Sequence, residues 1–307
     1  MNNLSICIPT FNRYQFLKWT LEKTCKDFPE STIIVSDNHS EDGTCFTDPY
    51  GKEWHEQYKF KMIRQMHNIG AFENMRAVLL AAQTKYCMYL GDDDYLLHEQ
   101  TANAINWMEK HPDVLAYIAP CQLWDEIAGR SHFNEFYVSE NITFDNYVKP
   151  TFTGPAALWN FIIGKHVWPE HIIWRREGLE RILRPRLRAY WAFVDITNAF
   201  LLGPIHFARR PFYRSIVEHP VGNRQKLGDR QCLTNFDEYR GGLEVMAYEL
   251  FKRSLTPELK VQIQHMITKF ITIRLEVAAR LLRMQHIDNE AESYEKRMVL
   301  GMLGRND

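Results

Sequence analysis

The chain has 307 residues, a formal net charge of -1, a hydrophobic fraction of 45% and a charged fraction of 24%. This balance excludes an intrinsically disordered chain and the strongly basic surface that is typical of proteins that bind nucleic acid. The length suffices for one large domain with an appendage, or for two domains, with a full hydrophobic core.

The sequence shows no sign of export or of membrane insertion. A predicted strand begins at Leu4, which leaves no room for a signal peptide, and no apolar segment approaches the length of a membrane span. The six cysteines are scattered without a Cys-x-x-Cys pair, as in a reduced cytosolic protein. We therefore expect a cytoplasmic protein whose contact with a membrane is at most peripheral, on the inner face.

Strands and helices alternate along the first third of the chain. Apolar runs predict strands at residues 4–9, 31–36, 60–65, 86–90 and 114–119, and helical spacing predicts helices at 13–25, 71–82 and 98–110. This β-α-β-α order implies right-handed crossovers and a mainly parallel sheet, so the class is α/β.

Three aspartates, Asp92, Asp93 and Asp94, directly follow the predicted strand at 86–90. Adjacent carboxylates repel one another, and they are tolerated mainly where a cation or water screens them. The carboxyl end of a parallel strand is also where ligands bind in such sheets, so a divalent metal is the first candidate. The alternative is a solvated acidic turn that caps the helix starting near His98.

Polar residues stand at three further strand ends of the predicted sheet. Asp37 is placed to accept hydrogen bonds from a base or ribose, or else it closes an Asx-turn. Arg13 could neutralise a phosphate, or else form a salt bridge at a helix start. Gly70 lets the backbone approach a ligand, or else belongs to a plain turn and helix cap.

Four segments resemble, in order, the family 2 glycosyltransferases with the GT-A fold. They are Ile6-Cys7-Ile8-Pro9-Thr10-Phe11-Asn12-Arg13, then Val35-Ser36-Asp37-Asn38 with Ser40, Asp42 and Thr44, then Asn68-Ile69-Gly70, and Leu90-Gly91-Asp92-Asp93-Asp94. The resemblance is strong over residues 4–120, weaker to about 220, and fades after that. It implies a GT-A catalytic domain at 1–230 with a Rossmann-like sheet, divided into a nucleotide-sugar-binding half at 1–120 and an acceptor-side half at 121–230. A helical C-terminal region at 231–307 follows.

The resemblance also implies a binding site for a nucleotide diphosphate sugar. Asp37 would hold the base, and the acid cluster would bridge through Mn²⁺ or Mg²⁺ to the diphosphate. Gly91 stands where relatives are often acidic, which leaves open which carboxylate ligates the metal; we favour Asp94 as the direct ligand. The implied donor-binding residues are Pro9, Thr10, Phe11, Asn12, Arg13, Asp37, Asn68, Gly70, Asp92, Asp93 and Arg214, and the implied metal ligands are Asp94, Asp92 and His219.

The family's catalytic base usually lies near the start of a helix in the second half. The segment 190–198 resembles that motif, and Asp195 is its only acid, although Val194 replaces the first acid of the family's Glu-Asp pair. As the base, Asp195 would give inversion at the anomeric carbon; the alternative is a helix cap or a solvated helix residue. Trp174, Arg175 and Trp191 are candidates for acceptor binding, because sugar faces stack on aromatic rings, although most Trp side chains are simply core.

Three C-terminal helices are predicted at 236–254, 257–285 and 288–303. We expect them to pack on the catalytic domain or on a second subunit, as in a homo-oligomer. Many relatives act on lipid-linked acceptors, so peripheral membrane contact through the basic residues of this region is an alternative to a plain solvated face.

These expectations combine into a metal-dependent inverting glycosyltransferase. The donor would be a nucleotide diphosphate sugar and the acceptor a glycan or lipid-linked oligosaccharide, in the synthesis of O-antigen, capsule or another surface polysaccharide. The alternatives are a non-catalytic sugar-binding relative and a sugar nucleotidyltransferase, which would need a glycine-rich N-terminal loop that residues 9–13 do not provide. Base, sugar, acceptor and linkage are not readable from the sequence.

Overall fold

The computed structural model describes residues 1–42, 58–131, 145–148, 154–184, 189–222, 236–284 and 288–302. Thr44, Cys45 and Cys232 lie outside the described residues, as do the last positions predicted for the second and third C-terminal helices.

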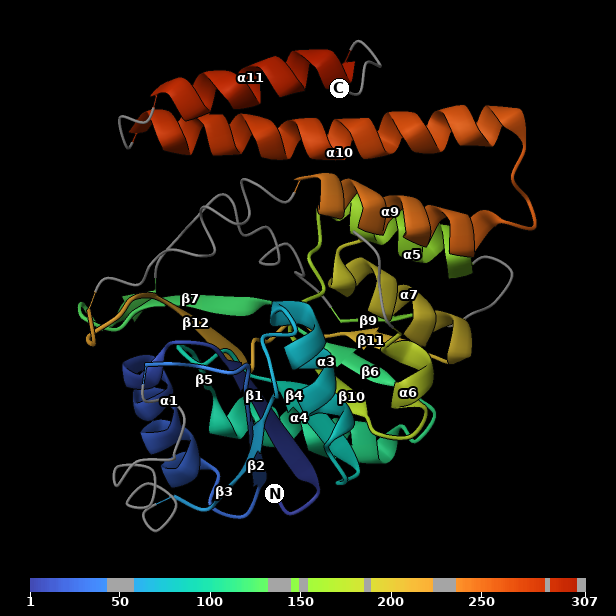
Figure 1. The fold of residues 1–307 in the computed structure, drawn as a ribbon. Helices are drawn as coiled ribbons and strands as arrows, with labels where there is room; N and C mark the ends of the chain where they lie inside the picture. The colour runs from blue at the N-terminus through green and yellow to red at the C-terminus, as the bar shows by residue number, and fades with distance from the viewer. Residues whose placement is uncertain are drawn as a thin grey trace.

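An eight-stranded sheet forms the centre of the molecule, in the order β3-β2-β1-β4-β10-β6-β11-β9 (Figure 1). Its strands are β1 (Leu4–Thr10), β2 (Thr32–Asp37), β3 (Phe60–Arg64), β4 (Tyr86–Tyr89), β6 (Ala116–Ile118), β9 (Asn146–Val148), β10 (Ile172–Arg175) and β11 (Ile205–Phe207). Strands β3, β2, β1 and β4 pair in parallel, as the alternation predicts.

The second half of the sheet departs from the predicted pattern. Strand β10 pairs antiparallel with both β4 and β6, and β9 pairs antiparallel with β11. The strand predicted at 114–119 is β6, but β10 separates it from β4. The sheet is therefore mostly parallel, with β10 reversed between its two halves and β9 reversed at its edge.

A smaller four-stranded sheet, in the order β5-β12-β7-β8, lies beside the main one. Its strands are β5 (Tyr95–Leu96), β12 (Tyr213–Glu218), β7 (Cys121–Asp125) and β8 (Arg130–Ser131). Strand β5 begins directly after Asp94, and β12 pairs with it. The chain thus brings residues from position 213 onward next to the acid triplet.

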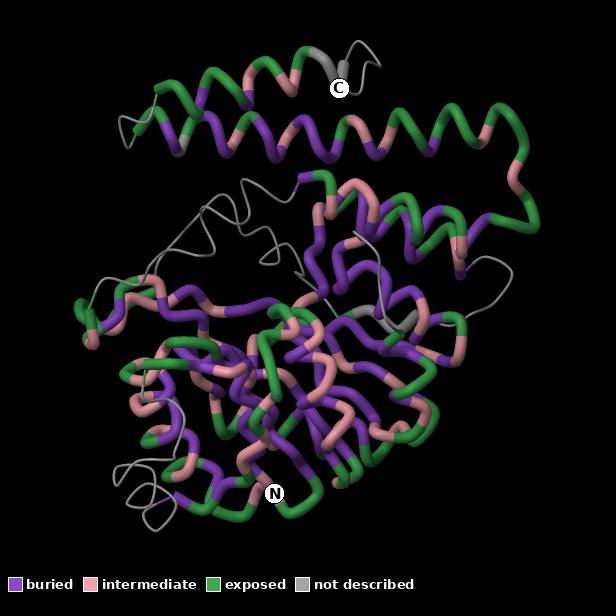
Figure 2. Tube along the Cα trace, in the orientation of Figure 1, coloured by how far each residue is buried: buried purple, intermediate pink, exposed green. Residues whose placement is uncertain are grey.

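Helices cover both faces of the main sheet. They are α1 (Tyr14–Asp27), α3 (Ala71–Leu80), α4 (His98–Lys110), α5 (Gly154–Lys165), α6 (Leu179–Ile182), α7 (Trp191–Leu202), α9 (Phe236–Phe251), α10 (Pro257–Met284) and α11 (Asp288–Met302). Because successive side chains of a strand point to opposite faces, Ile6 and Ile8 pack with α1 and α4, whereas Cys7 packs with α3 and α7. Both faces of the sheet are buried, as Figure 2 shows.

The three C-terminal helices predicted from the sequence are present. Helix α9 packs on α7 and α5, α10 lies across α9, and α11 runs back along α10 (Figure 1). A Cβ added at Gly242 of α9 would lie 2.9 Å from the backbone oxygen of Tyr190, so α9 touches the start of α7 through bare backbone. None of the described helices is both long enough and apolar enough to cross a bilayer.

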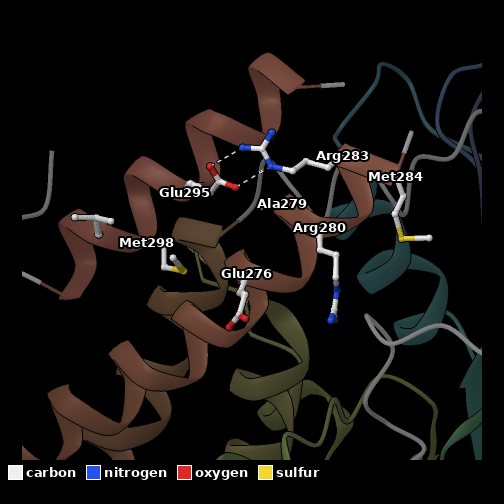
Figure 3. A pocket seen from close by; sticks show the side chains of 8 residues that line it. Glu276, Ala279, Arg280, Arg283, Met284, Glu295 and Met298 are labelled. Carbon is white, nitrogen blue, oxygen red and sulfur yellow. Dashed lines mark hydrogen bonds and ion pairs between the residues drawn. The ribbon is translucent and has the colours of Figure 1, made fainter. Parts of the chain in front are cut away.

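An ion pair joins the two outermost helices. The guanidinium of Arg283 in α10 binds the carboxylate of Glu295 in α11 through two contacts, Nη2 to Oε2 at 2.7 Å and Nε to Oε1 at 3.0 Å (Figure 3). Both side chains are exposed to solvent, which screens their charges, so the pair contributes little to stability. The hairpin is held chiefly by apolar residues on the facing sides of the helices, among them Leu282 and Ala291.

Candidate active site

The carboxyl ends of β2, β1 and β4 meet at one edge of the main sheet. Thr10 ends β1 and pairs with Asp37 at the end of β2. The Thr10 hydroxyl donates a hydrogen bond of 2.7 Å to Oδ2 of Asp92, and its carbonyl accepts one of 2.9 Å from the Asn38 backbone N–H. Thr10 therefore links the two sites that the sequence places at separate strand ends.

The acid triplet is buried rather than solvated, because Asp92, Asp93 and Asp94 are 6%, 3% and 6% exposed. Arg13 offsets part of their mutual repulsion: its Nη2 lies 2.5 Å from Oδ2 of Asp93, and its Nε lies 3.5 Å from Oδ1 of Asp92. The Thr20 hydroxyl of α1 lies within hydrogen-bonding distance of the backbone oxygens of Asp92 and Asp94, at 2.9 and 3.2 Å. Arg13, which directly precedes α1, and Thr20 within α1 thus hold the triplet in place.

Asp94 is anchored by the second sheet. Its Oδ2 accepts a hydrogen bond of 2.8 Å from the Tyr213 hydroxyl, and its Oδ1 accepts one of 2.7 Å from the Ile216 backbone N–H. The Tyr213 hydroxyl in turn accepts a hydrogen bond of 2.9 Å from the Gly91 backbone N–H.

The side chains around Gly91 pack closely against it. A Cβ at Gly91 would lie 3.0 Å from Oδ2 of Asp94 and 3.1 Å from both Oδ1 of Asp93 and the Tyr213 hydroxyl. A side chain at position 91 would require these oxygens to shift by a few tenths of an ångström.

The triplet has the chemistry of a site for a hard divalent cation, since Mg²⁺ and Mn²⁺ prefer carboxylate oxygens. Oδ2 of Asp94 and Oδ1 of Asp93 both approach the same point beside Gly91. The described residues contain no group of three or more His, Cys, Asp or Glu side chains arranged to hold a metal by themselves. A cation at this edge would therefore need oxygens from water or from a ligand as well.

Asp37 is buried next to the triplet edge, at 1% exposure. Its Oδ1 accepts a hydrogen bond of 3.1 Å from the Ser40 backbone N–H, whereas its Oδ2 has no hydrogen-bond partner within the part of the chain that the structure describes. A buried carboxylate oxygen without a donor is costly, and an incoming ligand with an N–H or O–H group would relieve that cost.

Side-chain amides build the loops around Asp37. The Asn38 side chain donates to Oδ1 of Asn68 at 2.8 Å and accepts from the Ile69 backbone N–H at 2.9 Å. Asn12, at a φ of 52°, donates through its backbone N–H to Oγ of Ser40 at 2.8 Å. These bonds hold the loops after β1, β2 and β3 together.

The first strand and the loop before α3 supply the remaining donor-side candidates. Gly70 has a φ of 87°, which a glycine adopts without strain, and space is open around its Cα. Phe11 is 40% exposed beside Asn12, and Pro9 is partly exposed. An exposed ring at this edge is free to stack on a planar group.

Asp195, the base predicted from the sequence, is fully buried at 0% exposure. It is the fifth residue of α7, and every residue from Trp191 to Thr197 is buried. Trp191 itself is 7% exposed, and its ring lies 6.4 Å from that of Tyr89. Asp195 is thus one helical turn away from the start of α7, where Trp191 lies.

The sequence analysis missed Glu170, a partly exposed residue two positions before β10. Oε1 of Glu170 accepts a hydrogen bond from the hydroxyl of Tyr190, which precedes α7. Burial raises the pKa of Glu170 to about 7, while the positive charge of Arg274 in α10 opposes that rise. A Glu with a raised pKa at the ligand-binding edge of the sheet is a functional candidate that no pattern in the segment 168–175 indicates.

Two predicted acceptor contacts are corrected by the structure. Trp174 is 1% exposed and belongs to the core between the sheet and its helices. Arg175 is 5% exposed, and its guanidinium donates to the backbone oxygens of Val114, Met108 and His111. Trp174 pairs with Cys87, and Arg175 pairs with Tyr86 at the beginning of β4. Trp174 and Arg175 therefore lie toward the edge of the sheet opposite the triplet.

Arg214 and His219, also predicted on the donor side, lie in the second sheet and just after it. The Arg214 guanidinium bonds to Gln122 and to the Tyr95 hydroxyl, and it stacks 3.9 Å from the Trp124 ring centre, so its charge is engaged within the second sheet. The His219 ring packs against two rings of α1, those of Phe16 at 4.8 Å and Trp19 at 4.4 Å. It does not form a group of three metal ligands with Asp92 and Asp94 within the described part of the chain.

A model of the protein family described as "Glycosyl transferase family 2" matches residues 5–167. The chain belongs to glycosyl transferase family 2. The matched residues contain β1 from its second residue onward, the end of β2 and the acid triplet, and the match ends before Glu170. The family expected from the sequence is therefore confirmed.

Among curated proteins, the abequosyltransferase RfbV of Salmonella typhimurium is 32% identical over 119 residues. The aligned part covers 36% of this chain and 34% of that protein, so the similarity spans about a third of the relative's length.

Among the solved structures that this chain resembles in fold are one from S. aureus and one from Pyrobaculum calidifontis. TarS of S. aureus, residues 1–349 in complex with UDP-GlcNAc, matches with a TM-score of 0.54 and 15% identity, over 99% of this chain and 92% of that one. The mannosyltransferase PcManGT of Pyrobaculum calidifontis, in complex with GDP-Man and Mn²⁺, matches with a TM-score of 0.54 and 14% identity, over 98% of this chain and 84% of that one. The GT-A fold expected from the sequence is confirmed.

Proposed function

We propose that this chain is a metal-dependent, inverting glycosyltransferase that moves a sugar from a nucleotide diphosphate sugar to a hydroxyl of a glycan or lipid-linked acceptor. One observation carries the proposal: Thr10 joins an acid triplet to a buried Asp37 whose Oδ2 has no hydrogen-bond donor among the described residues. A cation site and an unsatisfied acceptor side by side fit the two ends of a nucleoside diphosphate.

The donor side follows from the chemistry of each group. An ionised Asp37 accepts hydrogen bonds only, so it suits the imide or amino N–H of a base or the hydroxyls of a ribose. The exposed ring of Phe11 is placed to stack on the base. Arg13 already neutralises Asp93, and its guanidinium would also face the negative diphosphate.

Asp92 and Asp94 are the proposed metal ligands from the protein. A bound Mn²⁺ or Mg²⁺ would act as a Lewis acid that stabilises the negative charge of the departing nucleoside diphosphate. The hydrogen bonds from Tyr213 and Ile216 fix the orientation of the Asp94 carboxylate, and the bond from Thr10 fixes that of Asp92. Such fixed ligands would cost little reorganisation when a ligand binds.

The transfer itself needs a base on the acceptor side. The acceptor oxygen forms a bond to the anomeric carbon, the bond from that carbon to the phosphate oxygen breaks, and the electron pair leaves with the nucleoside diphosphate. The proton of the acceptor hydroxyl goes to a carboxylate on the opposite face of the sugar, for which Asp195 is the candidate from the sequence. A single displacement of this kind inverts the anomeric configuration.

The similarity to an abequosyltransferase supports a sugar as the transferred group, and the UDP-GlcNAc and GDP-Man complexes of the two structural relatives support a nucleotide-linked donor. The Mn²⁺ in the second of these complexes supports a divalent metal. We place the reaction in the cytoplasm, in the synthesis of a surface polysaccharide, with residues 1–230 as the catalytic part and 231–307 as a helical support.

A thermal-shift screen of nucleotides and nucleotide sugars, with Mn²⁺ or with EDTA, tests the proposal. A ligand that binds only the folded state increases the free energy of unfolding by RT ln(1 + [L]/Kd), which is about 2.7 kcal/mol at a hundredfold excess over Kd. The melting temperature rises as a result. We expect one nucleotide family to raise the melting temperature with Mn²⁺, and EDTA to remove the shift.

A matched pair of variants locates the binding site. Asp37→Asn should lose the shift, whereas Asp27→Asn, an exposed position at the end of α1, should keep it. Donor hydrolysis in the presence of Mn²⁺ then separates an enzyme from a binding protein. Hydrolysis that proceeds equally well in EDTA would contradict the metal dependence.

A further inference from the structure

The reversed direction of β10 brings a second carboxylate source to the active-site edge. Ile173 pairs with Met88, and Arg175 pairs with Tyr86, so β10 runs toward the beginning of β4. The residues just before β10 therefore lie at the carboxyl end of β4, where the acid triplet begins. Glu170 is one of these residues.

Tyr89 ends β4 just before the acid triplet and is partly exposed. The pKa of Tyr89, the last residue of β4, is raised by burial and then by the negative charges of Asp94, Asp93, Asp92 and Glu170. The charges of all four residues thus act on the Tyr89 phenol. Trp191, at the start of α7, lies on the same side, with its ring 6.4 Å from that of Tyr89.

Glu170 and Asp195 differ in what a substrate could reach. Glu170 is partly exposed at the sheet edge, whereas Asp195 has no exposed surface and lies among buried residues of α7. A general base has to come within hydrogen-bonding distance of the proton it removes, about 2.6–3.2 Å between heavy atoms. Glu170 accepts a hydrogen bond from Tyr190, which directly precedes α7. The accessible carboxylate near the start of α7 is therefore that of Glu170 and not that of an acid in the helix.

We propose that Glu170 is the general base that accepts the proton of the acceptor hydroxyl, with Tyr190 as the residue that positions it. The inference rests on the proposed function, since it names the base of that same transfer. The acceptor O–H bond breaks as the oxygen bonds to the anomeric carbon, the proton moves to a carboxylate oxygen of Glu170, and the leaving group departs as described above. Glu170 then returns the proton to solvent.

The surroundings of Glu170 suit this task. A base works best when its pKa is near the working pH, and the pKa of Glu170 is raised to about 7. The titratable and charged groups that face it are Arg274 from α10, Tyr190 before α7 and Tyr89 from β4. The neighbouring His171 adds no charge, because burial lowers its pKa to about 3.

The C-terminal helices support the positioning residue. The Tyr190 backbone N–H donates a hydrogen bond of 2.8 Å to the Glu238 backbone oxygen of α9, and Gly242 lets α9 approach the Tyr190 backbone. The Tyr190 ring packs 5.4 Å from that of Trp168, over which the Arg274 guanidinium lies at 4.6 Å. The helical region would thus serve catalysis by fixing Tyr190, and through it Glu170.

The test compares Glu170→Gln with Glu177→Gln, an exposed glutamate beyond the other end of β10, in the full chain. Hydrolysis of the donor found by the thermal-shift screen is measured, with water as the acceptor. We expect Glu170→Gln to lower kcat by about 10²- to 10⁴-fold while the melting-temperature shift given by the nucleotide and Mn²⁺ stays unchanged. Glu177→Gln should match the wild type in both measurements.

The pH profile gives a second, independent readout. Wild-type kcat/KM should rise as pH increases through about 7 and then level off, because the base must be ionised. Glu170→Gln should lack that rise, and Tyr190→Phe should move its midpoint, whereas a purely structural role would change neither.

Failure of this inference can be told apart from failure of the proposed function. Wild-type-like kcat in Glu170→Gln overturns the inference, as does a loss of kcat in a folded Asp195→Asn that still binds nucleotide. If Asp195→Asn fails to fold, the pH profile of Glu170→Gln decides. If no nucleotide sugar raises the melting temperature, or if the wild type turns over no donor, the proposed function fails and this inference falls with it.

Discussion

Substituting Gly242 by alanine tests the contact between the C-terminal helices and the start of α7. The added Cβ would lie 2.9 Å from the backbone oxygen of Tyr190, 3.0 Å from its backbone nitrogen and 3.1 Å from its Cβ. Non-bonded carbon contacts are favourable near 3.5–4.0 Å, so α9 has to move away by about half an ångström. The nearest atoms are backbone, which does not rotate out of the way.

Two opposing terms set the size of the effect. Replacing a glycine by alanine inside a helix contributes about 1 kcal/mol of stability through the unfolded chain. Overpacking a tight contact costs about 1–3 kcal/mol. We expect a net loss of about 1 kcal/mol and up to about 2 kcal/mol, which for a chain of this size lowers the melting temperature by roughly 2–6 °C.

Gly164→Ala is the matched control, because this glycine is also helical and a Cβ there would meet nothing within 4 Å. It should leave the melting temperature unchanged or raise it. Both variants are measured by thermal unfolding at one protein concentration, together with donor hydrolysis. If Gly242→Ala is as stable as Gly164→Ala, the close approach of α9 to Tyr190 is not a feature of the folded protein in solution.

Three further outcomes follow from the site. Tyr213→Phe removes the hydroxyl that binds Asp94, and we expect denaturant titration to show a loss of about 1–2 kcal/mol in the free energy of unfolding. Thermal shift should show weaker Mn²⁺-dependent nucleotide binding, and unchanged Mn²⁺ binding would contradict the anchoring role of Tyr213. Asp37→Asn should keep or raise the melting temperature of the unliganded protein while nucleotide binding falls, because it removes a buried charge with an unsatisfied oxygen, and a large loss of stability would count against this reading. The raised pKa of Glu170 means that its neutral form stabilises the fold below its ordinary pKa of about 4.5, and that this stability is lost as pH rises to about 7. At pH 8, Glu170→Gln should therefore have a higher melting temperature than the wild type and a free energy of unfolding that is larger by at most roughly 3 kcal/mol. This difference in stability should vanish near pH 4, and a difference that stays constant with pH would refute the pKa shift.

The first half of the fold follows from the sequence because its signals are local. Alternating apolar runs and helical spacing predict the strands and helices from β1 to α4, and the parallel order follows from the crossover rule. The polar residues at the strand ends then fall on one edge. Direction is different: a short, fully buried run such as Ile172–Arg175 carries no mark of whether it runs with or against its neighbours.

The acceptor side could not be predicted for the same reason. Glu170 gains its position only from the antiparallel pairing of β10, which links residues more than eighty positions apart in the chain. Asp195 was chosen because it is the only acid in its segment, but α7 is apolar on all sides, and a helix of that kind is buried. The apolar sequence of α7 thus indicates that the Asp195 side chain is buried.

Because β10 runs antiparallel to β4, two separate stretches of chain contribute to the same edge of the sheet. The proposed nucleotide-binding groups come from the first hundred residues, while the loop entering β10 and the start of α7 reach the same edge of the sheet from the other side. Substitutions in the second set are therefore expected to change acceptor contacts more than nucleotide contacts. On this arrangement, a protein with this fold could change its acceptor while it keeps the same nucleotide-sugar donor.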